Sequence, residues 1–143
     1  MTQDLTAKNN EQSIDQTIKA LKDSTRGLIF SNLVDFDMLY GHRRDTEGYA
    51  KALEHFDARL TEIESAMRDD DVLMITADHG NDPTFHGSDH TREYAPLLVY
   101  GARSLPGINL GTRDSLSDIG QTIAANFGLK LSAGHSFLDK IKQ

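Results

Sequence analysis

The sequence contains no cysteine, and this absence excludes both a disulfide framework and a thiolate metal site. No apolar run approaches the roughly 20 residues that cross a membrane, and the first residues lack the basic and apolar regions of a signal peptide. Basic residues number 15 against 22 acidic ones, and the net charge of −7 argues against a nucleic-acid surface. We therefore expect a cytoplasmic protein with neither a nucleic-acid nor a membrane partner.

What remains is an ordinary globular composition. The chain has 143 residues, of which 38% are hydrophobic and 26% are charged, enough for one buried core. Residues 1–26 are interpreted as a polar N-terminal segment with a short helix, and residues 27–143 as part of a core domain.

Apolar residues alternate between two kinds of pattern along the chain. Helical spacing with plausible N-caps at Ser13, Asp45 or Thr46, and Ser117 predicts helices at 13–22, 45–68 and 117–127, the last ending at Gly128. Short apolar runs predict strands at 27–36, 72–76 and 96–100. A strand, a long helix and a second strand imply parallel pairing through a right-handed crossover. The expected fold class is α/β, with a parallel or mixed sheet flanked by helices.

Two of the predicted strands end in potential metal ligands. The strand at 72–76 runs into Thr-Ala-Asp-His-Gly at 76–80, and Asp-His-Thr-Arg-Glu follows at 89–93. The strand at 27–36 runs into Asp35 and Asp37, with His42 five residues after the second. Open α/β sheets bind ligands at the carboxyl ends of their strands. Aspartate and histidine together suit borderline cations such as manganese or zinc.

This combination of motifs resembles the phosphopentomutase family of the alkaline phosphatase superfamily. The segments that carry the resemblance are 34–45, 76–100 and 117–122, within a similarity that covers roughly residues 27–139. Asp-His-Gly alone is shared across the superfamily, whereas Gly-His-Arg-Arg-Asp and Asp-His-Thr-Arg-Glu are more specific. The resemblance implies an alkaline-phosphatase-like core domain without its cap domain.

The resemblance also implies a reaction and its cofactors. The family interconverts ribose 1-phosphate and ribose 5-phosphate, and the deoxyribose pair, in nucleotide salvage, using two Mn²⁺ ions or other divalent cations. Asp37, His42 and His90 would bind one cation, and Asp78 and His79 would bind the second. The substrate partner would be a sugar phosphate.

Parts of the family pattern are not found in this sequence. The threonine that carries the phosphoryl group and one metal-binding aspartate belong to the family's N-terminal part, so we expect no catalytic residue here and no activity from the chain alone. The chain would be a C-terminal fragment. Its partners would be the N-terminal part of the enzyme or a second copy that pairs with an exposed sheet edge.

Charged residues beside the proposed ligands have two interpretations each. Asp35 is either a helix cap or, as we favour, a hydrogen-bond acceptor behind a ligand, and Asp89 is interpreted as an acceptor for His90. Arg92 would contact phosphate or pair with a carboxylate. For Arg43 and Arg44 we favour ion pairs with nearby carboxylates over phosphate contacts.

The other three histidines are not predicted to bind metal. His55 is predicted to be a surface residue, His135 a structural one, and His86 a loop residue that the family pattern does not require. Another enzyme of the superfamily, such as cofactor-independent phosphoglycerate mutase or a phosphatase, is the first alternative function. A non-catalytic metal-binding fragment is the second.

Overall fold

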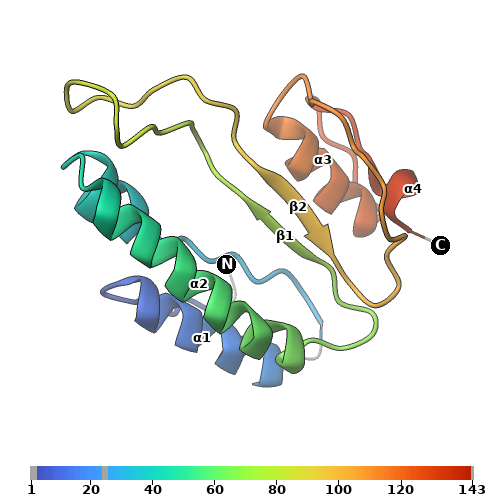
Figure 1. The fold of residues 1–143 in the computed structure, drawn as a ribbon. Helices are drawn as coiled ribbons and strands as arrows, with labels where there is room; N and C mark the ends of the chain where they lie inside the picture. The colour runs from blue at the N-terminus through green and yellow to red at the C-terminus, as the bar shows by residue number, and fades with distance from the viewer. Residues whose placement is uncertain (1–2, 24–25, 143) are drawn as a thin grey trace. The chain divides into compact units, whose positions relative to one another are not determined.

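Two long helices pair in the computed structural model, which describes residues 3–23 and 26–142. Helix α1 (Asn10–Asp23) and helix α2 (Thr46–Ala66) lie side by side (Figure 1). Both contribute buried isoleucines, Ile14 and Ile18 from α1 and Ile63 from α2. Ion pairs join the exposed edges of the helices, since Arg59 of α2 contacts both Glu11 and Asp15 of α1.

The chain divides into two compact units. The first contains Met1–Met67 and His79–Tyr94, and the second contains Arg68–Asp78 and Ala95–Gln143. Helices α1 and α2 and the π-helix η1 (Phe36–Gly41) belong to the first unit. In the part of the chain that the structure describes, no helix has both the length and the apolar character needed to cross a membrane.

The second unit is built around a strand pair. Strand β1 (Leu73–Thr76) pairs antiparallel with β2 (Leu97–Tyr100), so that Leu73 lies opposite Tyr100 and Thr76 opposite Leu97. Helix α3 (Ser117–Asn126) and the short helix α4 (Leu138–Ile141) contact each other in the same unit (Figure 1). The predicted strands at 72–76 and 96–100 are therefore confirmed to within one residue.

The predicted strand at 27–36 is wrong. Residues 28–33 belong to no strand, and the end of the predicted segment lies in η1. A strand exists only where a neighbour accepts its backbone hydrogen bonds, and among the described residues this segment has none. Leu28 and Phe30 are 59% and 85% exposed. The expected parallel or mixed sheet is correspondingly not found in residues 3–23 and 26–142, whose one sheet is antiparallel.

The predicted helices are present, but two of the predicted caps are wrong. Helix α1 begins before Ser13, and the Asn9 side chain accepts a hydrogen bond from the Gln12 amide at 2.9 Å. Helix α3 has no side-chain cap, and the Ser117 amide donates to the Ser115 hydroxyl at 3.2 Å. Gly128 has the left-handed φ of 71° expected of a residue that ends a helix.

A buried carboxylate anchors the C-terminal segment of the second unit. Asp118 is 1% exposed, and it accepts hydrogen bonds from the His135 amide and the Arg113 guanidinium, both at 2.8 Å. The neighbouring Thr122 hydroxyl donates to the Asp118 carbonyl and accepts from the Phe137 amide at 3.0 Å. These bonds fix the segment that carries Phe137, itself 1% exposed, against α3.

Asp45 caps helix α2 as predicted, and its removal gives the first testable prediction. The Asp45 carboxylate accepts from the Gly48 amide at 2.9 Å, which satisfies one of the free donors at the start of the helix. Asp45→Ala should lower the free energy of unfolding by about 1 kcal/mol. Urea denaturation checks this, with Asp57→Ala on the exposed middle of α2 as the control. Equal stabilities of the two variants would contradict the capping role.

Candidate metal centre

The spacing of Asp37 and His42 matches the geometry of the π-helix η1, which contains Asp37 and ends directly before His42. In a π-helix each amide bonds to the carbonyl five residues earlier, and the His42 amide donates to the Asp37 carbonyl at 2.9 Å. The two side chains therefore lie on the same side of the turn, with His42 Nε2 3.3 Å from Asp37 Oδ2. The five-residue interval in the sequence is thus a geometric requirement of this turn.

A backbone contact orients the His42 ring. His42 Nδ1 lies 2.6 Å from the carbonyl oxygen of Ser88. Because a carbonyl oxygen can only accept, Nδ1 carries a proton, and in the neutral ring Nε2 then keeps the lone pair. The lone pair is therefore on the nitrogen that faces Asp37, an arrangement typical of metal-binding histidines.

The segment 79–94 supplies two more imidazoles. Gly80 and Thr91 form an isolated antiparallel bridge, which brings the two ends of the segment together. A Cβ at Gly80 would collide with the Glu93 backbone, so this close approach requires glycine. His79 Nδ1 lies 3.2 Å from the Gly80 carbonyl, which in a neutral ring favours the tautomer with its proton on Nδ1. The bridge places His79 and His90 next to each other.

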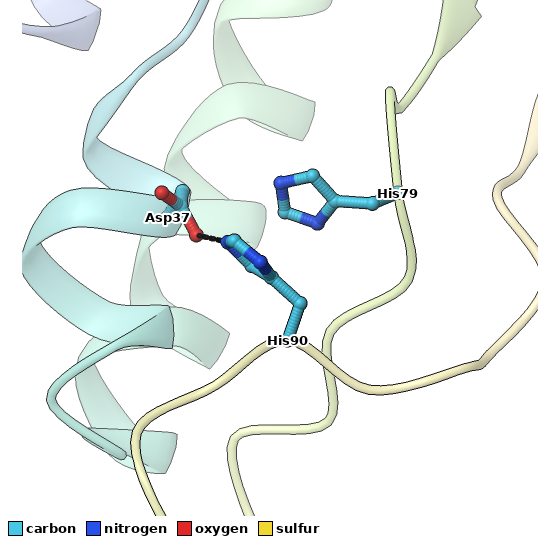
Figure 2. A group of neighbouring side chains, drawn as sticks. All are labelled: Asp37, His79 and His90. Carbon is cyan, nitrogen blue, oxygen red and sulfur yellow. Dashed lines mark hydrogen bonds and ion pairs between the residues drawn. The ribbon is translucent and has the colours of Figure 1, made fainter.

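Asp37, His79 and His90 converge on one point (Figure 2). Each offers one ligand atom, and these atoms all lie within 4.8 Å of one another. His90 Nε2 is 3.2 Å from Asp37 Oδ1, and the rings of His79 and His90 are 3.8 Å apart between centroids. The His42 ring lies 4.7 Å from that of His90. One carboxylate and three imidazoles therefore share one face of the first unit.

This donor set fits a divalent cation. Two ligand atoms about 2.1 Å from a common ion lie at most about 4.2 Å apart, so the present group, which lies within 4.8 Å, would have to draw closer around an ion. Imidazoles combined with a carboxylate suit manganese, zinc and similar ions better than magnesium. The orienting bonds on His42 and His79 supply the support that such ligands usually have.

A tyrosine next to the cluster remains protonated. Burial, and then the negative charge of Asp37, raise the pKa of Tyr49 above the ordinary phenol value. The Tyr49 ring also packs against Phe36 with 5.6 Å between centroids. We infer that Tyr49 supports the turn by packing and does not act as a base.

The structure brings together four of the five predicted ligands. Asp37, His42, His79 and His90 all belong to the first unit. Asp78 precedes His79 in the chain, but it belongs to the second unit, and its side chain is exposed. His79 approaches His90 and Asp37 closely, so the two expected ligand groups are adjacent. Their division between two cations stays a prediction.

The residues predicted to lie behind the ligands have other partners here. Asp35 accepts from the Asn10 amide at 2.8 Å, while the Asn10 side chain accepts from the Asp35 amide at 2.9 Å. This reciprocal pair at the start of α1 fits the helix-cap alternative, and the role of Asp35 behind a metal ligand stays a prediction. Asp89 offers its backbone carbonyl to Arg44. Arg92 is exposed and has no hydrogen bond or ion pair among the described residues.

The remaining histidines lie outside the cluster. His55 is exposed on α2 and contacts Glu11 at 2.5 Å, as expected of a surface residue. His86 stacks on Phe85 with centroids 4.2 Å apart. His135 acts through its backbone, which donates to Asp118 and accepts from Arg113. None of the three shares the ligand group of Figure 2.

Sequence reasoning did not find the partners of Arg44. The favoured ion pairs with carboxylates are absent among residues 3–23 and 26–142, and the guanidinium instead contacts carbonyl oxygens of the segment 79–94. Charge patterning could not reveal this, because carbonyl acceptors exist at every residue. The Ser88 carbonyl that orients His42 was missed for the same reason.

The π-turn and the bridged segment together define a protein with a divalent-metal site. Comparison with known families agrees, since residues 1–131 match the model of the Metalloenzyme superfamily. The chain belongs to the Metalloenzyme superfamily, the alkaline-phosphatase-like group that the motifs implied.

Individual relatives carry a more specific name. The chain is 54% identical over 138 residues to the phosphopentomutase of Clostridioides difficile (strain 630). The aligned residues cover 96% of this chain and 35% of that protein. The chain is 51% identical to the phosphopentomutases of Desulfitobacterium hafniense (strain DSM 10664 / DCB-2), over 99% of this chain, and of Symbiobacterium thermophilum, over 100% of it. These matches cover 37% of each of the two relatives. The chain thus spans about a third of the length of the curated relatives it matches.

Proposed function

We propose that this chain is part of a phosphopentomutase and that it provides metal ligands for the interconversion of ribose 1-phosphate and ribose 5-phosphate, and of the deoxyribose pair. The observation that carries the proposal is the convergence of Asp37, His79 and His90, with His42 beside them, in a chain 54% identical to a protein of that name. Nucleotide salvage and a cytoplasmic location are proposed with the reaction, because its substrates are soluble sugar phosphates.

The proposed cofactors are two divalent cations, with Mn²⁺ preferred. Asp37, His42 and His90 would hold one, and His79 with its chain neighbour Asp78 would hold the other. Bound about 4 Å apart, such cations neutralise the charge of a transferring phosphoryl group and lower the pKa of the attacking hydroxyl. The 3.8 Å between the His79 and His90 rings supports neighbouring rather than distant ion positions.

The contribution of this chain's own residues is orientation. The Ser88 carbonyl holds His42 Nε2 toward Asp37, and the Gly80 carbonyl does the same for the His79 ring. Donors that are aimed before a ligand arrives lose little further freedom on binding, which is the main requirement of phosphoryl-transfer sites. The Asp37 carboxylate adds the negative charge that draws a cation into the group.

The rest of the machinery would come from the remainder of the enzyme. We propose that the other two thirds supply the phosphoryl-carrying threonine, a further aspartate ligand and most substrate contacts. They would also complete the larger parallel or mixed sheet, in which the exposed segment 28–32 would take part. Alone, this chain is expected to bind metal and to lack turnover, and a second copy could occupy the place of the missing strands.

A chimeric enzyme tests the proposal. The matching third of the Clostridioides difficile phosphopentomutase would be replaced by this chain, and the product assayed with ribose 1-phosphate and with 3-phosphoglycerate. We expect conversion of ribose 1-phosphate to ribose 5-phosphate that depends on added Mn²⁺. His86→Ala in the chimera should leave this rate unchanged, because His86 lies outside the ligand group.

Each other outcome favours a named alternative. Turnover of 3-phosphoglycerate without turnover of ribose 1-phosphate would favour a phosphoglycerate mutase. A folded chimera that binds Mn²⁺ but converts neither compound would favour a non-catalytic metal-binding fragment. Either result would refute the phosphopentomutase assignment.

A further inference from the structure

Arg44 has a backbone conformation that is unfavourable for arginine. Its φ is 55°, and no other described residue except glycines has a positive φ. The Arg44 amide donates to the Gly41 carbonyl at 3.1 Å and the Asp45 amide to the Tyr40 carbonyl at 3.0 Å. This is the bonding pattern with which helices commonly end, and glycine is the usual residue at its left-handed position. An arginine here needs a compensating role for its side chain.

The side chain has such a role within the first unit. Arg44 Nε donates to the Gly87 carbonyl at 2.5 Å, and Nη1 donates to the Asp82 carbonyl at 2.8 Å and to Asn81 Oδ1 at 3.1 Å. Nη2 donates to the Asp89 carbonyl. One guanidinium therefore binds four oxygens spread over nine consecutive residues, 81–89, of a segment without regular secondary structure.

The hydrogen bonds of Arg44 lie next to the contacts that orient the metal ligands. The Asp89 carbonyl held by Arg44 directly precedes His90, and the Ser88 carbonyl beside it accepts from His42. Arg44 itself follows His42 by two residues on the turn that carries Asp37. One side chain therefore connects the segment carrying His90 with the turn carrying two further ligands.

We propose that Arg44 is a positioning residue that fastens segment 81–90 to the π-helical turn and thereby sets the separation of His90 from Asp37. Its side-chain hydrogen bonds among the described residues all go to neutral carbonyl oxygens, which favours a positioning role over contact with a phosphate. The effect on metal affinity rests on the proposed function, whereas the fastening of the segment does not.

Arg44→Gly is the most informative variant. Glycine adopts the positive φ without steric cost, so the substitution removes the four side-chain hydrogen bonds and leaves the turn unstrained. Amide hydrogen exchange reads the segment directly, at the hydrogen-bonded amides of Asp82 and Phe85. We expect exchange about 10-fold or more faster at these amides, and an Mn²⁺ affinity about 10- to 100-fold weaker by isothermal titration.

Two further variants separate positioning from a general loss of structure. Arg43→Ala removes an exposed neighbouring arginine that makes no hydrogen bond or ion pair in the described part of the chain, and it should change neither readout. Arg44→Lys keeps the charge but offers one ammonium group in place of a planar fork, so it should restore only part of the Mn²⁺ affinity.

Amide hydrogen exchange and Mn²⁺ affinity test different parts of the proposal. Unchanged exchange at Asp82 and Phe85 in Arg44→Gly would overturn the proposal, whether or not metal binds. Faster exchange with unchanged Mn²⁺ affinity would overturn the link to the ligands. A wild-type chain that binds no Mn²⁺ would count against the proposed function, and the exchange result would still decide whether Arg44 fastens the segment.

Discussion

His90→Ala should weaken Mn²⁺ binding to this chain on the order of 100-fold or more. His90 occupies the middle of the cluster, with Nε2 3.2 Å from Asp37 and its ring against both His79 and His42. Its removal leaves the remaining donors without their common neighbour, and alanine offers no replacement ligand. Isothermal titration of the folded chain with MnCl₂ measures the affinity of each protein directly.

The matched control is another histidine of the same segment. His86→Ala removes an exposed imidazole that contacts Phe85 and no member of the cluster, so its Mn²⁺ affinity should equal that of the wild type. Two variants weakened to the same degree would mean that binding is nonspecific. A His90→Ala protein with wild-type affinity would remove His90 from the ligand set.

The second large effect is expected on stability. Asp118→Ala should lower the free energy of unfolding by about 3–5 kcal/mol, the usual consequence of breaking a buried ion pair. Asp118 is 1% exposed, whereas its partner Arg113 is the more exposed member of the pair at 21% for the side chain. The substitution also leaves the His135 amide without its acceptor. Urea denaturation at pH 7 gives the difference, and Asp114→Ala, at an exposed position nearby, should stay near the wild type.

The lowered pKa of the Asp118 carboxyl predicts how the stability difference between the wild type and Asp118→Ala depends on pH. The hydrogen bond from the His135 amide, aided by the Arg113 guanidinium, lowers the pKa of Asp118 below its ordinary value, against the opposing effect of burial. A lowered pKa means that the contribution is complete above the unfolded value of about 3.9 and is lost as the pH falls through the folded value. The difference in free energy of unfolding between the wild type and Asp118→Ala should therefore become smaller below about pH 4. A gap that widens there would reverse the assigned sign.

The helices were the most predictable part of this fold. In α2 the apolar residues recur at three- and four-residue intervals, and Asp45 precedes the first turn with a side chain that can accept from it. Both signals are local, so they are visible without knowledge of the rest of the molecule. The errors at Ser13 and Ser117 have the same origin, because several nearby side chains could serve as caps and the sequence does not choose between them.

The strand predictions failed where the partner was not local. The apolar run at 27–36 has strand composition, but composition does not specify which neighbour accepts its hydrogen bonds. Strands β1 and β2, which lie within the predicted ranges 72–76 and 96–100, pair with each other. Leu28 and Phe30, in contrast, are exposed in a chain about a third as long as its relatives.

The site was predictable as a set of residues and not as a geometry. Asp37 and His42 are five positions apart, and the motif resemblance selected both, but only the π-helical turn explains the interval. The proximity of His79 to His90 depends on the Gly80–Thr91 bridge. Contacts of that kind join residues far apart in the sequence, and they involve backbone atoms that every residue type possesses.

The left-handed arginine has a consequence for protein engineering. A redesign that considers only the backbone conformation of this turn would place glycine at position 44. Such a sequence would relieve the backbone conformation of one turn while losing the four hydrogen bonds that order a neighbouring segment. Position 44 is thus a place where the local backbone and the ordering of a neighbouring segment favour different amino acids.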